Sequence, residues 1–286
     1  MTAARWAFDA IGTRWEIESA EPLGADLRDD VTALIDGFDR EWSRFRDDSA
    51  VTRLGVAGGA VPAPADAVAL LGIYRELDAA TGGAVNPLIG AALARRGYDA
   101  RVTRVDHGAE PAPADWTRIL TVDEDLLRLT GPAVIDVGAA GKGRLVDRVA
   151  GLIAARVTGD VVVDASGDLV VRGGPVRVGL EHPYDPRRAI GAWEIADGAL
   201  CASAVNRRAW GESLHHVLDA RTGEPVRTIA ATWARGADAL HADATATALF
   251  FDGGPELAYR WGVEWARMTT DGRVEWSPGG KEGLFL

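Results

Sequence analysis

The sequence predicts an α+β fold built from two entwined α/β lobes with mixed sheets. Apolar residues at helical spacing indicate long helices in the first third of the chain, whereas short apolar runs bounded by turn residues indicate strands further on. The two kinds of segment are mixed along the chain and do not strictly alternate, which favours an α+β fold with two entwined lobes.

The first third is predicted to hold one strand and two helices. Residues 8–18 open with alternating polar and apolar side chains, which predicts a strand, and Gly12-Thr13 predicts a kink within it. Apolar residues then recur at steps of three and four over 26–45, which predicts a helix packed on the core. A Gly/Ala/Pro-rich loop is expected at 56–64, followed by a helix over 65–80 that ends at a glycine pair.

The remaining two thirds are predicted to alternate irregularly between strands, loops and helices. Residues 102–114 are charged, contain proline and show no periodic spacing of apolar residues, so we expect a loop on the surface. The other predicted elements are a hairpin at 119–130, a strand at 133–136 followed by a glycine loop and an amphipathic helix, strands at 161–163, 169–172, 190–195 and 215–218, a helix at 242–251 and a hairpin turned at Asp271-Gly272.

Composition excludes several classes of protein. The 286 residues include 31 Lys and Arg against 42 Asp and Glu, a net charge of −11, which argues against a nucleic-acid binder. A hydrophobic fraction of 47% excludes a disordered chain and suits one domain over residues 1–286 or two intimately packed lobes. Cys201 is the only cysteine, so no internal disulfide is possible, and we expect it to be a small buried side chain.

The sequence shows no targeting or membrane segment. The N-terminus lacks a basic region followed by an apolar stretch and a small-residue cleavage site, so we expect no export signal. The most apolar runs are interrupted by charges well short of the roughly 20 residues that a membrane span needs. We therefore expect a soluble, cytoplasmic protein without a membrane span.

A glycine-rich loop at 136–143 is the first candidate binding feature. Asp136 ends the predicted strand, small residues follow, and Lys142 opens the predicted helix, an arrangement that suits a phosphate. The loop is not a P-loop, because Gly143 occupies the position that requires Ser or Thr. A tight strand-to-helix turn without any ligand explains the same residues.

Asp243 and Thr247 are the candidate metal ligands. Their spacing of four places both side chains on one helix face, where oxygen ligands favour Mg²⁺ over zinc. The alternative is a helix N-terminus that Asp243 caps, with small neighbours for close packing. We expect His241, just before this segment, to be exposed or to cap the helix.

The neighbouring His215 and His216 should point to opposite faces of a predicted strand. Only one of them can therefore reach a given site, which argues against a two-histidine metal pair. Such a histidine could donate to a phosphate or carry a proton, and the alternative is a core histidine with its hydrogen bonds satisfied.

In their order along the chain, these segments resemble the ApbE family, the FAD:protein FMN transferases. The resemblance covers nearly the whole sequence. Its most specific parts are Asp-x-Gly-x-x-x-Lys-Gly-x-x-x-Asp from Asp136, His-x-x-Asp-x-x-Thr-Gly from His216 and Ala-Asp-Ala-x-x-Thr-Ala-Leu from Ala242. Departures include Gly141 where Ala is usual, and Ser203-Ala204 where the family tends to have Ser-Gly.

The resemblance implies an ApbE-like fold and a Mg²⁺-dependent enzyme. Such an enzyme cleaves FAD, attaches FMN by a phosphoester to a Thr or Ser of an acceptor protein, and releases AMP. By similarity, the Ala139 carbonyl, Asp243 and Thr247 would hold Mg²⁺, and His216 and Asp243 would be catalytic. The residues that would contact FAD are Ile11, Ser43, Asn86, Pro87, Leu88, Asp136, Lys142 and Val217.

Two other functions fit the same residues. With water in place of the acceptor hydroxyl, the site would be an FAD pyrophosphatase that yields FMN and AMP. A non-catalytic flavin-binding protein would instead keep FAD intact. The chain carries no Asp-x-x-Thr/Ser-Gly-Ala-Thr motif, so we do not expect it to be flavinylated itself.

Overall fold

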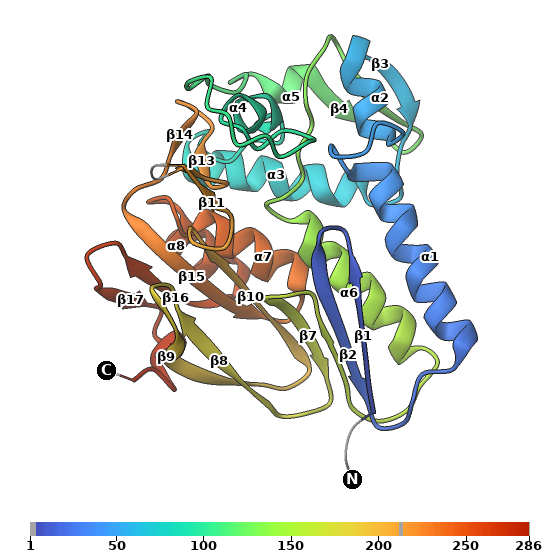
Figure 1. Ribbon diagram of the computed structural model, residues 1–286, viewed down its shortest axis with the longest axis vertical. Coiled ribbons are helices and arrows are strands. Elements are labelled where there is room, and N and C mark those ends of the chain that lie inside the picture. The colour runs from blue at the N-terminus through green and yellow to red at the C-terminus, as the bar shows by residue number, and fades with distance from the viewer. Residues whose placement is uncertain (1–3, 212–213, 286) are drawn as a thin grey trace.

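A computed structural model describes residues 4–211 and 214–285 and centres on one large sheet (Figure 1). The sheet has eight strands in the order β1-β2-β6-β7-β10-β15-β16-β17. The strands are β1 Ala4–Ala10, β2 Thr13–Ser19, β6 Val161–Asp164, β7 Asp168–Arg172, β10 Gly198–Ala204, β15 Ile229–Gly236, β16 Glu264–Thr269 and β17 Val274–Trp276. Helices and strands together confirm the α+β class. Each pair of neighbouring strands in this large sheet is antiparallel, so the sheet does not contain the expected mixture of parallel and antiparallel pairs.

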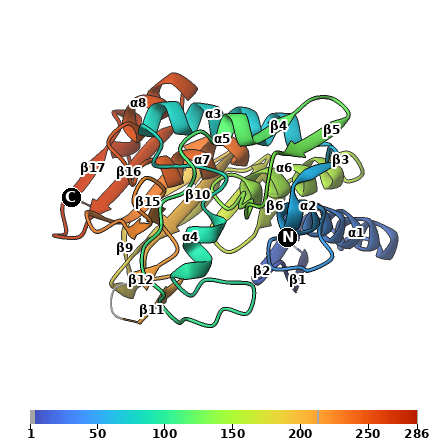
Figure 2. The ribbon, with the colours of Figure 1, turned by 90° about the horizontal axis from the view of Figure 1, so that it is seen from above.

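Helices cover one face of the sheet and a long hairpin covers the other (Figure 2). Helices α6 (Gly141–Ala154) and α7 (Ala239–Ala248) contact the strands directly, α1 (Ala25–Trp42) packs on α6, and α3 (Ala67–Thr81) and α8 (Gly254–Trp261) pack on α7. The hairpin consists of β8 (Val176–His182) and β9 (Asp185–Ile195).

The sheet therefore separates two hydrophobic cores, and β7 shows the division. Val170 belongs to the core under the helices, whereas Leu169 and Val171 belong to the core under the β8–β9 hairpin. Alternate residues of a strand point to opposite faces, and here both faces are covered. This explains why β7 is an almost continuous apolar run in the sequence.

Shorter elements surround the large sheet. The three-stranded sheet β3-β5-β4 lies beside α2, and two pairs of two-residue strands follow β10. These elements are α2 Ala50–Ala57, β3 Gly59–Pro62, α4 Gly90–Arg95, α5 Trp116–Ile119, β4 Leu120–Val122, β5 Leu126–Leu129, β11 Ala209–Trp210, β12 Leu214–His215, β13 Leu218–Asp219, β14 Glu224–Pro225 and the 3-10 helix η1 Gly279–Lys281.

The structure corrects the predicted kinked strand at 8–18. Two antiparallel strands, β1 and β2, occupy this region, and Ile11 and Gly12 form the turn between them. Both turn residues have positive φ, 47° for Ile11 and 72° for Gly12. Two consecutive positive φ values are typical of a tight hairpin turn. A β-branched residue rarely adopts one, so no turn is predicted at Ile11 from its residue type.

Four further predictions need correction. The loop expected at 56–64 contains the end of α2 and strand β3. The strand expected at 133–136 is not paired with another strand, because the N–H of Ala133 donates to Gly55 and that of Asp136 donates to Pro87. The predicted strand at 215–218 is divided between β12 and β13. Phe45 lies beyond the end of α1 and is 40% exposed, since the helix stops at Trp42 before the predicted stripe does.

Other expectations are confirmed. Helix α3 ends at Gly82 in a left-handed conformation, as the glycine pair predicts. The hairpins at 119–130 and around Asp271-Gly272 are present, and Cys201 is fully buried. Among the described residues, none of the helices combines the length and the apolar character that crossing a membrane requires.

Candidate active site

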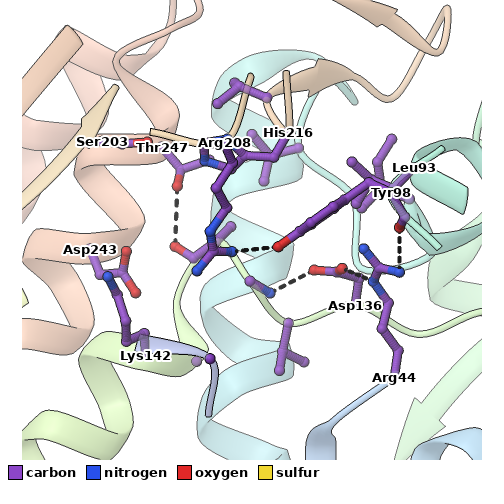
Figure 3. A pocket seen from close by; sticks show the side chains of 18 of the residues that line it. Arg44, Leu93, Tyr98, Asp136, Lys142, Ser203, Arg208, His216, Asp243 and Thr247 are labelled. Atoms are coloured by element: carbon purple, nitrogen blue, oxygen red, sulfur yellow. Dashed lines mark hydrogen bonds and ion pairs between the residues drawn. The ribbon is translucent and has the colours of Figure 1, made fainter. Parts of the chain in front are cut away.

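A pocket of about 500 Å³ lies where the β1–β2 turn, the end of α1, the 136–143 loop and α7 meet (Figure 3). This volume is within the usual range for small-molecule sites. Most residues singled out from the sequence line it, namely Ile11, Ser43, Asn86, Asp136, Ala139, Lys142, His216, Val217, Asp243 and Thr247. Pro87 and Leu88 are not among the described lining residues, and Leu88 is buried in the core.

Asp243 lies inside α7 and does not cap it. The helix begins at Ala239, and the Asp238 carboxylate caps it by accepting the backbone N–H of His241 at 2.8 Å. The capping alternative for Asp243 is therefore wrong. The Asp243 carboxylate instead accepts the backbone N–H of Gly143 at 2.8 Å, which joins α7 to the first turn of α6.

Gly143 allows this close approach of the two helices. A Cβ at Gly143 would overlap the carbonyl oxygen of Ala239 and lie 2.6 Å from the Cβ of Asp243. Asp147, one turn further along α6, accepts the N–H groups of Ala239 and Leu240 at 2.8 and 2.9 Å. The Lys-Gly-x-x-x-Asp pattern thus fixes α7 against α6, and with it the position of Asp243.

Three oxygen groups of different kinds gather beside this helix contact. Thr247 is one turn along α7 from Asp243, and its Oγ1 lies 3.5 Å from the carbonyl oxygen of Ala139. A carboxylate, a hydroxyl and a carbonyl are the donors that a hard cation such as Mg²⁺ prefers. The described residues form no cluster of three or more His, Cys, Asp or Glu suited to a metal, so a cation here would depend on the Thr247 and Ala139 oxygens.

Tyr74 fixes the loop that presents the Ala139 carbonyl. Its hydroxyl donates to the Asp136 carbonyl and accepts the Ala139 N–H, both at 3.1 Å. The side chain is buried, and burial, followed by the nearby Asp136 charge, raises the pKa of Tyr74 well above its usual value. The hydroxyl therefore remains a donor. Tyr74 is not recognisable from the sequence as a site residue, because nothing local distinguishes it from a core residue of α3.

Arg44 holds the Asp136 side chain. Arg44 Nε donates to Asp136 Oδ2 at 2.5 Å, and Nη1 donates to the carbonyl of Tyr98 at 2.8 Å. The other carboxylate oxygen of Asp136 accepts the Gly138 N–H at 2.7 Å. The Arg44 side chain is only 5% exposed, so the pair is largely shielded from solvent. The neighbouring Ser43 was predicted as a site residue. Arg44 was not, because its role depends on Asp136, which is 92 positions away in the sequence.

Lys142 is in the first turn of α6 and forms an ion pair with a buried carboxylate. Its Nζ lies 3.0 Å from Oδ2 of Asp168, whose side chain is 1% exposed. Burial disfavours the charged ammonium, but the Asp168 and Asp243 carboxylates outweigh it and raise the pKa of Lys142. The lysine therefore carries a positive charge into the pocket wall.

The two histidines point to different places, as their alternation predicts. His215 is buried, and its Nε2 lies 2.8 Å from the carbonyl oxygen of Val226, so it is the satisfied core histidine. His216 lines the pocket, and its buried Nδ1 has no hydrogen-bond partner within 4–211 and 214–285. Burial, and then the Arg208 charge, lower the pKa of His216 to about 3, so the ring is neutral near pH 7.

Fold and pocket together define an α+β protein whose ligand site combines oxygen donors, a buried arginine, a half-buried lysine and a neutral histidine. The sequence matches the ApbE family over residues 11–266. The chain belongs to the ApbE family.

Similar proteins agree with this assignment. The chain is 26% identical to the FAD:protein FMN transferase of Klebsiella pneumoniae (strain 342) over 273 residues, which cover 87% of this chain and 78% of that protein. The fold is similar to the crystal structure of the Pseudomonas stutzeri flavinyl transferase ApbE in its apo form, with a TM-score of 0.83 at 22% identity, covering 100% of this chain and 98% of that one. The flavin transferase ApbE from Vibrio cholerae gives 0.81 at 20% identity, covering 99% and 100%.

Proposed function

We propose that this protein is a Mg²⁺-dependent FAD:protein FMN transferase. It would cleave the diphosphate of FAD, join FMN through a phosphoester to a Thr or Ser hydroxyl of an acceptor protein, and release AMP. Family membership and the name of the Klebsiella relative support this reaction. The observation that carries the proposal is the grouping of Asp243, Thr247 and the Ala139 carbonyl on the wall of one pocket with Lys142 and His216.

The oxygen donors fit the metal that the proposal requires. Asp243, Thr247 and the carbonyl of Ala139 would hold Mg²⁺, which when bound supplies positive charge beside the diphosphate. Asp243 is buried and already accepts the Gly143 N–H through Oδ2, so its carboxylate is held in a fixed orientation. Because the carboxylate is already oriented, binding the cation costs less conformational entropy.

His216 and Lys142 have separate roles in the proposal. A neutral imidazole nitrogen without a partner can accept a hydrogen bond from the acceptor hydroxyl and orient it, and the Nδ1 of His216 has no partner among the described residues. Lys142 contributes a permanent positive charge to the same wall. Asp136, held by Arg44, would contact FAD together with Ile11, Ser43, Asn86 and Val217.

The test is incubation of the purified protein with FAD and Mg²⁺, with and without a threonine-bearing acceptor peptide. AMP is measured by chromatography and the peptide by mass spectrometry. We expect AMP and a peptide that gains the mass of an FMN phosphoester, both lost in Asp243→Asn, which preserves side-chain shape. Asp29→Asn, at an exposed position on α1, is the matched control and should retain activity.

Each other outcome assigns a different function. AMP without any modified peptide would favour an FAD pyrophosphatase. FAD that binds but stays intact in every sample would exclude both enzymes and leave a flavin-binding protein.

A further inference from the structure

We propose that Arg208 is a phosphate-binding residue of this pocket and that Tyr98 positions its guanidinium there. The inference deepens the proposed function and rests on it for the identity of the ligand, a dinucleotide with a central diphosphate. Both residues line the pocket, yet neither lies within the three motifs that carry the family resemblance.

Arg208 extends across the pocket to Tyr98 (Figure 3). Arg208 Nη1 donates to the Tyr98 hydroxyl at 2.9 Å, although 110 positions separate the two residues. The Tyr98 ring stacks on Trp210, with centroids 5.6 Å apart and planes 22° from parallel. Tyr98 is therefore a supported partner for the guanidinium.

The segment that carries Arg208 is anchored on both sides. Asn206 Nδ2 donates to the carbonyl of Pro183 in the β8–β9 hairpin at 2.5 Å. The buried Trp210 donates through Nε1 to the carbonyl of Arg96 at 2.7 Å. These two bonds hold residues on either side of Arg208, and the Tyr98 hydroxyl is the hydrogen-bond partner of its guanidinium among the described residues.

Arg208 differs from the neighbouring cations in its ion-pair partners. No carboxylate within 4–211 and 214–285 forms an ion pair with it, whereas the adjacent Arg207 pairs with Glu181 at 2.9 Å. Lys142 also faces the pocket, but Asp168 already balances its charge. A guanidinium has five N–H donors, and the one bond to the neutral Tyr98 hydroxyl leaves most of these donors available to an anion.

Arg208 lies within electrostatic reach of the other reactive groups. Burial has the largest effect on the pKa values of Lys142, His216 and Asp243. The positive charge of Arg208 also tends to lower each of these three pKa values. Arg208 and these three groups line the same pocket, so an anion bound by the guanidinium would share that pocket with them. The planar guanidinium fork binds phosphate oxygens in pairs, which an ammonium cannot do.

The experiment measures the affinity of the full chain for ADP, FAD and riboflavin by calorimetry. ADP carries the diphosphate without a flavin, and riboflavin carries the flavin without phosphate. We expect Arg208→Ala to weaken ADP and FAD binding by about 10- to 100-fold, the usual loss for a charged hydrogen-bond donor, and to leave riboflavin unchanged. Arg208→Lys keeps the charge without the fork and should fall between the two.

Tyr98→Phe tests the positioning role, because it removes the hydroxyl and keeps the ring. ADP affinity should fall by about 3- to 10-fold. The double variant Arg208→Ala/Tyr98→Phe should bind ADP no more weakly than Arg208→Ala alone, since the hydroxyl acts only through the guanidinium. Arg188→Ala, an exposed charge on β9 outside the pocket lining, is the charge-matched control and should behave as the wild type.

The outcomes separate this inference from the proposed function. ADP affinity that depends on Arg208 supports the inference even if no FMN is transferred. Unchanged ADP and FAD affinity in Arg208→Ala, an equal loss for riboflavin, or additive losses in the double variant would overturn it, even where transfer is intact. A wild-type chain that binds neither ADP nor FAD would overturn both.

Discussion

The hydroxyl of Thr247 lies 3.5 Å from the carbonyl oxygen of Ala139, across 108 positions of sequence. Neither group belongs to a charged residue, and each is oriented by its own element. Thr247 is fixed by α7, which Asp147 holds against α6, and the Ala139 peptide is held by the hydroxyl of Tyr74. This contact joins the two parts of the candidate cation site, and it can be tested directly.

Replacing Thr247 should weaken the cation site without unfolding the protein. Thr247→Ala removes one oxygen donor from a half-buried position, so the Mg²⁺ concentration that gives half-maximal AMP release should rise by about tenfold or more. Thr247→Ser keeps the hydroxyl and should stay within a few-fold of the wild type. Equal Mg²⁺ requirements in Thr247→Ala and the wild type would show that the hydroxyl is not a ligand.

Gly143→Ala should be strongly destabilising, because the added Cβ would overlap the backbone oxygen of Ala239 and crowd Asp243. Overpacking of this kind typically costs about 1–3 kcal/mol of unfolding free energy, measured by urea denaturation. Gly151, in the same helix, is the matched control, since nothing lies within 4 Å of a Cβ there. Gly151→Ala should stabilise by up to about 1 kcal/mol, and similar effects at both glycines would contradict the close helix contact.

His216 should make the stability depend on pH in the acidic range. Its pKa in the folded protein is about 3, below the ordinary histidine value of 6.5. Between pH 3 and 6.5 the His216 side chain binds a proton in the unfolded chain but not in the folded protein. The contribution of the neutral ring to the free energy of unfolding is therefore fully present above pH 6.5 and is lost as the pH falls toward 3. One proton changes the free energy of unfolding by at most about 1.4 kcal/mol per pH unit.

Urea denaturation at pH 7, 6, 5 and 4 checks this expectation. His216→Gln removes the titrating group, so its stability should fall less steeply than that of the wild type below pH 6.5. His107→Gln, at an exposed position, is the matched control and should follow the wild-type curve. Parallel curves for the wild type and His216→Gln would show that His216 is not held in its neutral form.

The sequence by itself determined the elements whose signal is local. Apolar spacing located α1 and α3, and Gly82 marked the end of α3. Where the local signal was absent, prediction failed. The β1–β2 turn uses Ile11 with a positive φ, which no turn preference predicts, and 133–136 has no strand partner.

The candidate site shows the same division. Ordered motifs identified Asp136, Lys142, His216, Asp243 and Thr247, because each lies in a short pattern of fixed spacing. Only the tertiary structure decided which groups these residues meet. Arg44 binds Asp136 across 92 positions and Arg208 binds Tyr98 across 110. Local periodicity places a side chain on a face of its own helix or strand, whereas a hydrogen bond also requires that the packing of the whole sheet bring a second segment within about 3 Å of it.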